Sequence, residues 1–461
     1  MNNPPFKPGP VYAAGTLRYD RRSMAILFGW LLWGDFAFTF FEQTFGRFMP
    51  LYLKDLNASN TLIGITTGSI AGLVNVFFLP NISQWSDRFR SRLGRRIPFL
   101  LVVTPLTTVS LLAVGLAPEI SAWLHQNVTS SLAPWLTGST LLLSLLCLFT
   151  ISFHLFNMVL VNSYNWLLRD VVPPVLMARF LSWFRVVGTL AAVLFLWYVF
   201  PTMLSHRKEA FLLVGLFYFV SFMLMCWKIK EGDYAEPEPR PPGTNLWKSF
   251  GTYFRDGLSV PLYRNFFLVY VLILLATTCT SSFLALYARH TLGLDMEEMG
   301  HIYAYAQMVS AGAYIVMGLL CERFHPMRVT LTSIFVLLAG TLLAYLFVDG
   351  QKSWLIYSLL FPIPLIGWGL GSQAVSMLLF PEKAFGQFYS GMNVFGCGGL
   401  IVGTYLIGQF MDLNGSQYQA VFLWSAVFFA AAIFPMIAVY RGWKQHGGPN
   451  RYEPPLPPHL A

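Results

Sequence analysis

The sequence contains few charged residues for its length. Lys, Arg, Asp and Glu make up 11% of the 461 residues, whereas hydrophobic residues make up 56%. Soluble domains carry about 25% charged residues. This composition excludes an ordinary soluble protein, and it predicts that most of the chain lies in a membrane.

Cysteine is also scarce. The five cysteines lie within or at the ends of apolar runs, and no two of them have metal-ligand spacing. We therefore expect no disulfide framework, no metal site and no cofactor. The net charge of +9 comes from basic residues scattered between apolar runs. Such scattering indicates contact with anionic lipid headgroups rather than nucleic acid.

Twelve apolar runs approach the roughly 20 residues that a membrane helix needs. The predicted spans are residues 24–46, 62–85, 97–116, 137–161, 180–201, 209–228, 265–287, 299–320, 329–348, 354–377, 390–411 and 419–440. The first run is too long for a removable signal peptide, so we expect no cleavage. The sequence predicts an all-α membrane protein of twelve transmembrane helices.

A Pro-rich connection divides the chain into halves. It contains Glu-Pro-Glu-Pro-Arg-Pro-Pro-Gly from residue 236 and an amphipathic stretch from residue 246 to 255. The predicted domains are an N-terminal tail (1–23), a six-helix bundle (24–228), a linker (229–264), a second six-helix bundle (265–440) and a C-terminal tail (441–461).

The distribution of basic residues predicts the orientation in the membrane. If the N-terminus is cytoplasmic, 24 of the 30 Lys and Arg residues fall on the cytoplasmic side. Positive charge concentrates on that side of membrane proteins. We therefore expect both termini in the cytoplasm and the loop from Pro118 to Pro134 outside, in a plasma membrane or a bacterial inner membrane.

A short, strongly basic segment separates the second and third apolar runs. Residues 86–99 read Ser-Asp-Arg-Phe-Arg-Ser-Arg-Leu-Gly-Arg-Arg-Ile-Pro-Phe. This order resembles the loop between helices 2 and 3 of the major facilitator superfamily, in the longer form of sucrose transporters and related glycoside transporters. A basic loop beside anionic lipid is the alternative, but it leaves the embedded Asp and Gly unexplained. The resemblance implies two pseudo-symmetric six-helix bundles and a gating role for Asp87, Arg88, Gly94, Arg95 and Arg96.

The two halves also show weak internal repetition. Phe180-Leu-Ser-Trp-Phe-Arg-Val-Val-Gly opens the fifth predicted span, and Phe388-Tyr-Ser-Gly-Met-Asn-Val-Phe-Gly opens the eleventh. Repeated six-helix halves are typical of transporters. The predicted gate therefore also includes Asp170, Arg179, Glu322 and Arg323. We expect Asp87 to lie near the start of span 11, and Glu322 near the start of span 5.

Two acidic residues lie inside the first predicted span. A carboxylate in the middle of a membrane helix costs about 2.5 to 3.5 kcal/mol on insertion scales. Asp35 and Glu42 are two helical turns apart, so they share one face of the helix. We expect them to carry proton coupling, with Asp35 as the favoured site. The alternative is a structural Asp35 paired with a neighbouring helix, and a Glu42 near the exterior interface.

The fourth predicted span carries a polar stripe that lipid would reject. Sucrose–proton symporters have Asp-x-x-Asn in this helix and then Arg-Ala-Leu-Leu-Ala-Asp-Leu, and the first Asp is associated with sugar and proton binding. This chain resembles that frame, with His154 in place of the Asp and Asn165 in place of the Arg. The resemblance implies solute binding by His154, Asn157 and Asn165. A histidine that only packs is the alternative.

Sugar binding requires neutral hydrogen-bonding groups and aromatic faces rather than one strong charge. Further candidates for solute binding are Arg185, Gln307, Trp368, Gln373 and Asn393. The partner that we expect for Arg185 is Asp170 or an acidic residue that faces the cavity.

The acidic pair of the sodium-linked glycoside transporters is missing. Their second helix has Asp-x-x-x-Asp-Pro, where this chain has Asn75, Leu79 and Pro80. Proton symport of a sugar or glycoside, driven by the proton gradient in a monomeric membrane protein, is therefore our interpretation. An exporter of drug-like or lipidic solutes is the first alternative. A membrane enzyme or a receptor is the second, although no catalytic motif supports it.

Overall fold

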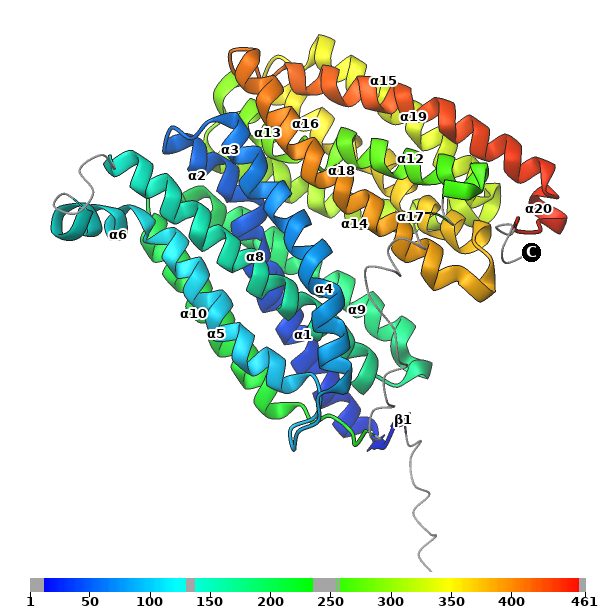
Figure 1. Cartoon of the computed structure of the whole chain (residues 1–461), viewed down its shortest axis with the longest axis horizontal. Helices are drawn as coiled ribbons and strands as arrows, with labels where there is room; N and C mark the ends of the chain where they lie inside the picture. Colours follow the sequence, from blue (N-terminus) through cyan, green and yellow to red (C-terminus); the bar gives the residue numbers. More distant parts are fainter. Residues whose placement is uncertain (1–11, 130–136, 235–254, 256–257, 456–461) are drawn as a thin grey trace, which may run out of the picture. The chain divides into compact units, whose positions relative to one another are not determined.

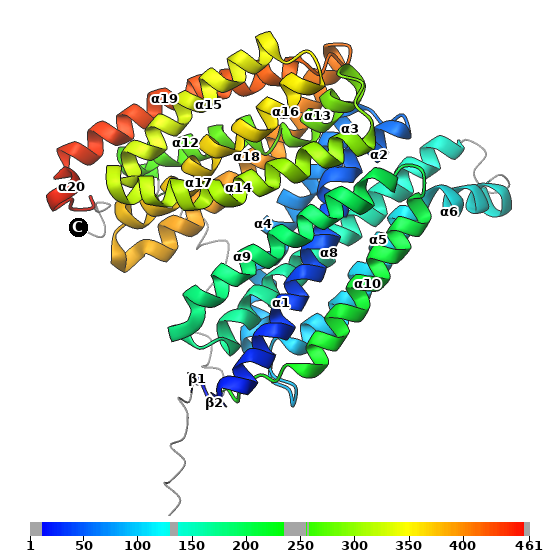
Figure 2. The same ribbon diagram turned by 180° about the vertical axis from the view of Figure 1, so that it is seen from behind.

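The computed structural model describes residues 12–129, 137–234, 255 and 258–455, and most of them are helical (Figures 1 and 2). In this part of the chain, twelve helical segments are long and apolar enough to cross a membrane. They are Arg21–Asp55, Asn60–Arg88, Ile97–Gly115, Gly138–Val171, Pro174–Thr202, Arg207–Lys228, Pro261–Thr291, Met296–Phe324, Pro326–Phe347, Gln351–Leu379, Phe385–Leu413 and Ala420–Gln445. The predicted number of spans is confirmed. The Pro-rich stretch from residue 236 and the amphipathic stretch lie outside the described residues, except for Arg255.

The fourth span ends well beyond its predicted end. The sequence predicted an end at residue 161, but helix α8 (Gly138–Val171) continues for almost three more turns. Its last turns contain asparagines that lower the apolar character without breaking the helix. Pro173 and Pro174 follow at the point where the helix does end.

The N-terminal segment contains structure that the sequence did not predict. Strands β1 (Tyr12–Ala14) and β2 (Leu17–Tyr19) pair in antiparallel fashion. Gly15 provides the positive φ of 56° in the turn between them. Asp20 then caps helix α1 (Arg21–Gln43) in a capping box with Ser23.

The predicted external loop is also partly helical. It contains helix α6 (Ala117–Leu124) and a short π-helical segment, η3 (His125–Thr129), whereas residues 130–136 lie outside the described part. Glu119 forms ion pairs with Arg207 at 3.3 Å and Lys208 at 2.9 Å, both at the start of helix α10 (Arg207–Lys228). These pairs attach α6 to α10.

The chain divides into two compact units. Unit 1 comprises residues 1–45, 77–195 and 202–239, and unit 2 comprises residues 46–76, 196–201 and 240–461. The division passes through continuous helices, such as helix α4 (Ile70–Arg88), rather than only through the linker.

In unit 1, helix α5 (Ile97–Gly115) packs against α8 and α10, and α1 packs against α10 and helix α9 (Met177–Leu194). Gly34 lies where α1 approaches α10, because a Cβ atom at this position would be 2.3 Å from the Met225 sulfur. The Tyr164 hydroxyl of α8 donates to the Leu31 carbonyl of α1 at 2.6 Å. Unit 1 is thus a bundle whose helices are joined by close packing and buried hydrogen bonds.

Unit 2 contains the remaining long helices, the end of the first span and the start of the second. They are α2 (Met49–Asp55), α3 (Asn60–Gly64), α12 (Pro261–Thr277), α13 (Ser281–Leu286), α14 (Met296–Phe324), α15 (Pro326–Phe347), α16 (Gln351–Leu360), α17 (Pro362–Leu379), α18 (Phe385–Leu413), α19 (Ala420–Gln445) and α20 (Gly448–Arg451). A buried apolar core joins α12, α15, α17, α18 and α19.

Short 3-10 and π-helical segments complete the described elements. They are η1 (Thr44–Phe48), η2 (Ile65–Ser69), η4 (Pro174–Leu176), η5 (Phe195–Val199), η6 (Phe200–Thr202), η7 (Tyr287–Thr291) and η8 (Glu382–Ala384).

Helices α3 and α18 approach each other very closely within unit 2. A Cβ atom at Gly64 would lie 2.0 Å from the Thr404 carbonyl oxygen, and one at Gly408 would lie 2.6 Å from the Asn60 carbonyl oxygen. The Asp412 carboxylate accepts hydrogen bonds from the backbone N–H groups of Asn60 and Thr61, at 2.9 and 2.8 Å. It thereby satisfies the first donors of α3.

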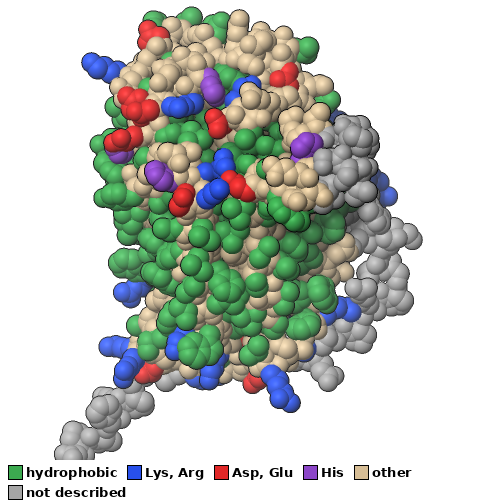
Figure 3. Space-filling model, turned by 90° about the vertical axis from the view of Figure 1, so that its left-hand side faces the viewer, with side chains coloured by type: hydrophobic (Ala, Val, Ile, Leu, Met, Phe, Trp, Pro, Cys, Tyr) green, Lys and Arg blue, Asp and Glu red, His purple; other side chains and the backbone are tan. Residues whose placement is uncertain are grey.

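The surface fits a membrane environment. On the face in Figure 3, hydrophobic side chains cover most of the middle, and charged side chains gather towards the two ends. Large apolar side chains that face outward include Val102 and Val109 of α5 and Leu213 and Leu216 of α10. Such a surface is stable in hydrocarbon and not in water.

Candidate functional site

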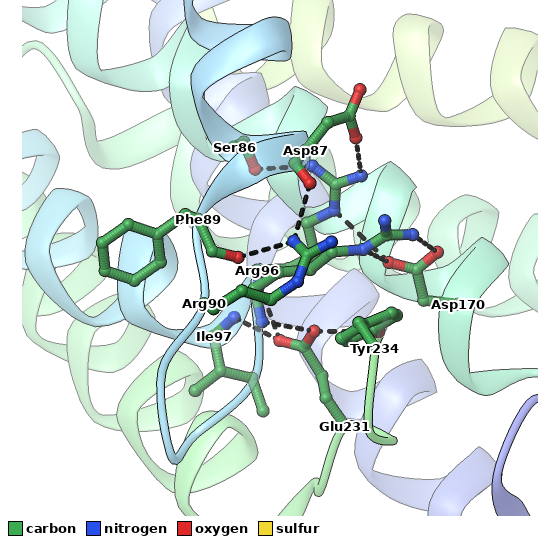
Figure 4. Close-up of polar contacts among 10 residues, drawn as sticks. Ser86, Asp87, Phe89, Arg90, Arg96, Ile97, Asp170, Glu231 and Tyr234 are labelled. Carbon is green, nitrogen blue, oxygen red and sulfur yellow. Dashed lines mark hydrogen bonds and ion pairs between the residues drawn. The ribbon is translucent and has the colours of Figure 1, made fainter. Parts of the chain in front are cut away.

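The basic loop after α4 is held by a cluster of ion pairs inside unit 1 (Figure 4). Asp170, at the end of α8, accepts from Arg95 at 2.7 and 2.9 Å and from Arg96 at 3.3 Å. Arg96 is 4% exposed and also donates to Ser86 and Asp87 of α4. The two arginines therefore tie the end of α4 to the end of α8.

A second acidic residue holds the same loop from the other side. One Glu231 oxygen accepts from the backbone N–H groups of Arg96 and Ile97 at 2.8 and 2.6 Å, and the other accepts from the N–H of Arg95 at 2.9 Å (Figure 4). Ile97 is the first residue of α5, Arg96 is its N-cap and Arg95 precedes the cap, so the carboxylate lies at the N-terminus of the helix, where the helix dipole also favours it. Glu231 thus acts as a cap supplied from the segment that follows α10.

Tyr234 is the last member of this group of contacts, which we call the loop cluster and which consists of Ser86, Asp87, Gly94, Arg95, Arg96, Asp170, Glu231 and Tyr234. Its hydroxyl donates to Glu231 at 3.0 Å, and the Arg95 guanidinium lies 4.2 Å from the centre of its ring. Burial, followed by the charge of Glu231, raises the pKa of Tyr234, so the phenol stays a hydrogen-bond donor. Gly94 has a φ of 104°, and a Cβ atom there would lie 2.5 Å from the Glu231 side chain. Only glycine fits this turn.

Sequence reasoning identified the arginines, Gly94 and Asp170 but missed Glu231 and Tyr234. The available signal was an acidic residue directly after Lys228 and Lys230. Its partners are backbone N–H groups, which leave no mark in the residue pattern.

The other predicted gate residues lie at the ends of three helices. Arg179 is exposed near the start of α9, and Glu322 and Arg323 are exposed at the end of α14. Arg88 is the last residue of α4. The expected approach of Asp87 to the start of α18, and of Glu322 to the start of α9, stays a prediction.

Asp35 is the most deeply buried acidic residue in the described chain, with 2% of its surface exposed. It lies against α9, where a Cβ atom at Gly188 would be 3.2 Å from its Oδ2 atom. That Oδ2 atom is buried and has no hydrogen-bond partner among the described residues. Arg185, exposed on α9, and Glu42, exposed on α1, are close enough to interact with it electrostatically.

The polar stripe of α8 also lies in unit 1. His154 is half-buried, with its ring 5.0 Å from that of Phe45 and 5.6 Å from that of Phe153. The Asn157 Oδ1 atom is buried without a hydrogen-bond partner in the described part of the chain. Asn165 is exposed. The stripe therefore offers polar groups of which at least one acceptor is unused.

The remaining predicted binding residues belong to unit 2. Trp368 is 6% exposed and is part of the apolar core, so its ring contributes to packing. Asn393 donates to the Tyr389 carbonyl of its own helix at 2.9 Å. Gln307 is half-buried and Gln373 is exposed.

An aromatic cluster in unit 2 brings Arg47 and Trp197, which were not among the predicted site residues, to ring side chains of α14. The Arg47 guanidinium lies 4.8 Å from the centre of the Tyr303 ring. Trp197 lies 4.5 Å from His301 and 5.3 Å from Tyr305 between ring centres. An arginine within an apolar run was the signal that could have identified this cluster.

A twelve-helix membrane fold with a braced basic loop and a buried carboxylate defines a membrane transporter of the major facilitator type. Residues 31–382 match the family described as "MFS/sugar transport protein". The match extends over more than half of the chain, so the protein belongs to this family. A comparison with curated protein sequences returns no match.

Solved structures share the fold at low sequence identity. A bacterial homologue of the human lysosomal transporter Spinster is 14% identical, with a TM-score of 0.67 over 95% of this chain and 100% of that one. A bacterial homologue of the iron transporter ferroportin is 17% identical, with a TM-score of 0.66 over 90% and 99% of the two chains. The nucleoside transporter NupG is 15% identical, with a TM-score of 0.60 over 91% and 99%. The protein is therefore an integral membrane transporter of the major facilitator fold.

Proposed function

We propose that the protein is a proton-coupled symporter of a small polar solute, a sugar or a glycoside. The observation that carries the proposal is the buried Asp35 carboxylate, with one oxygen that has no hydrogen-bond partner among the described residues. A carboxylate in this position is costly when charged, and it is tolerated best where its protonation state changes in function.

The surroundings of Asp35 support a change of protonation during transport. Arg185 of α9 and Glu42 of α1, which carry opposite charges, both lie close enough to act on it electrostatically. Rocking of the two bundles, by which transporters of this kind alternate access, changes the exposure of a cavity-facing group to water. Such a change would couple proton binding at Asp35 to transport.

The second helix does not favour sodium. Asn75, at one position of the missing acidic pair, donates its side-chain amide to the Ala71 carbonyl at 2.8 Å. An amide engaged with its own helix is a poor substitute for a carboxylate ligand. Sugar as the solute is supported by the family description and by the neutral polar groups of α8.

Uptake into proteoliposomes tests the proposal. With a panel of labelled sugars, the wild-type protein should accumulate solute only when a pH gradient is present. Asp35→Asn should retain exchange at equal solute concentrations but lose accumulation, because the amide cannot carry the proton. Asp55→Asn, which removes an exposed carboxylate at the end of α2, is the matched control and should accumulate normally.

His154→Ala separates solute binding from coupling. It should weaken solute binding, with a raised KM for exchange. Accumulation by Asp35→Asn at the wild-type level would place the proton site elsewhere. Normal binding by His154→Ala would show that the sucrose-transporter frame in α8 does not identify the solute site.

A further inference from the structure

A cavity of about 640 Å³ lies between the start of α12 and the end of α19 in unit 2. One part of its wall is apolar and includes Leu262, Phe434 and Ile437. The other part is polar and is formed by Asn265, Arg441, Gln445 and His446. The cavity is therefore amphipathic, with its apolar and polar groups separated along α19.

The apolar part lies at the depth of lipid chains. Phe434 is 75% exposed, and Val427, two turns earlier on α19, is 63% exposed. In a membrane protein such outward-facing side chains contact hydrocarbon. Arg441 follows Phe434 by seven residues on the same helix face, which places it about 10 Å further along the axis. This step leads from hydrocarbon to the headgroup region, where arginine is stable.

The polar part has free capacity for an anion. Among the described residues, Arg441 makes no ion pair or hydrogen bond, and the side chains of Asn265 and Gln445 make no hydrogen bonds. His446 donates its Nδ1–H to the Gly442 carbonyl at 2.8 Å, so the Nε2 atom of the neutral ring is an acceptor and adds no donor for an anion. No acidic residue is among the described residues that line the cavity. A guanidinium with unused donors matches a phosphate group in both charge and geometry.

We propose that this cavity binds an anionic glycerophospholipid from the membrane. Arg441 contacts the phosphate, Asn265 and Gln445 contact the glycerol or ester oxygens, and the first part of an acyl chain lies along Phe434, Ile437 and Leu262. Basic pockets between membrane helices are known to select anionic headgroups. A soluble phosphate would leave the apolar wall exposed, so the lipid explains both parts of the cavity.

Native mass spectrometry of the full-length protein tests the proposal. Delipidated protein in mild detergent is mixed with phosphatidylglycerol or phosphatidylcholine, and the fraction of lipid-bound protein is measured. We expect preferential retention of phosphatidylglycerol, and Arg441→Ala should weaken it about tenfold, the effect of losing a charged hydrogen-bond donor. Arg264→Ala removes an exposed arginine of α12 that does not line the cavity, and it should bind as the wild type.

Two further measurements distinguish the alternatives. Ala438→Trp should fill the apolar part of the cavity and reduce lipid binding while it leaves Arg441 in place. Inorganic phosphate at millimolar concentration should not displace the lipid. Equal retention of both lipids, or equal losses in Arg441→Ala and Arg264→Ala, would overturn the proposal, as would displacement by inorganic phosphate. Arg441→Lys keeps the charge but loses the planar fork of the guanidinium, so it should bind the lipid more weakly than the wild type and more tightly than Arg441→Ala.

Discussion

Removal of the Glu231 carboxylate should release the basic loop without unfolding the bundle. In Glu231→Ala the N–H groups of Arg95, Arg96 and Ile97 lose the acceptor that now lies 2.6 to 2.9 Å away. Loss of a side-chain cap costs about 0.5 to 2 kcal/mol. Loss of a negative charge at a helix N-terminus costs about 0.3 to 1 kcal/mol more.

The summed cost of about 1 to 3 kcal/mol has a direct readout in amide hydrogen exchange. Since 1.4 kcal/mol is a factor of ten, the amides of residues 95–97 should exchange about 5 to 150 times faster in Glu231→Ala. Glu231→Gln keeps an acceptor oxygen and loses the charge, so its acceleration should be only about 2- to 5-fold. Unchanged exchange in both variants would refute the assignment of Glu231 as the cap of α5.

Asp233→Asn is the matched control for this measurement. It removes a carboxylate two residues away, from a side chain that is exposed. Its exchange at residues 95–97 should equal that of the wild type. An equal effect in this variant would mean that general charge in the segment, and not the cap, protects the loop.

Three further predictions concern other parts of the protein. Gly64→Ala should destabilise the protein by about 1 to 3 kcal/mol, because the added methyl group is overpacked against the Thr404 carbonyl. Gly312 has open space around it, so Gly312→Ala should not destabilise the protein. Thermal unfolding of the two variants tests this difference. Burial raises the pKa of Glu119, but Lys208 and Arg207 of α10 lower it by more, so that it lies below the usual 4.5. The wild type should therefore be more stable than Glu119→Gln at neutral pH, and this difference should vanish as the pH falls through the lowered pKa. Melting curves at several pH values measure the difference. A reporter fused at Ala461 should be cytoplasmic, and an extracellular signal would contradict the predicted topology.

Much of the architecture could be predicted because membrane insertion is a local property of the sequence. A helix in hydrocarbon must satisfy its own backbone groups, so the length and polarity of each run reveal a span. The twelve spans were therefore recognised one by one. The end of α8 was placed too early because Asn162 and Asn165 lower hydropathy without interrupting the helix.

The loop cluster could be predicted only in part. Arg95, Arg96 and Asp170 stand out because charge is rare in this chain. The sequence did not show that both arginines bind Asp170, or that Glu231 caps α5. Arg95 and Asp170 are 75 positions apart in the sequence, and Arg96 and Glu231 are 135 positions apart. A local sequence pattern cannot show contacts between residues so far apart in the chain.

The sequence by itself determined the twelve spans, the expected orientation and the family resemblance, since all three depend on composition and residue order within short segments. Only the tertiary structure decided which polar groups have partners. Asp35 is significant because α9 approaches it at Gly188, and one of its oxygens has no hydrogen bond within the described part of the chain. In the sequence, Trp368 is an aromatic residue like those that bind sugars, yet the packing of unit 2 places it in the core. Burial is a property of the assembled helices, and it separates packing residues from residues available to a ligand.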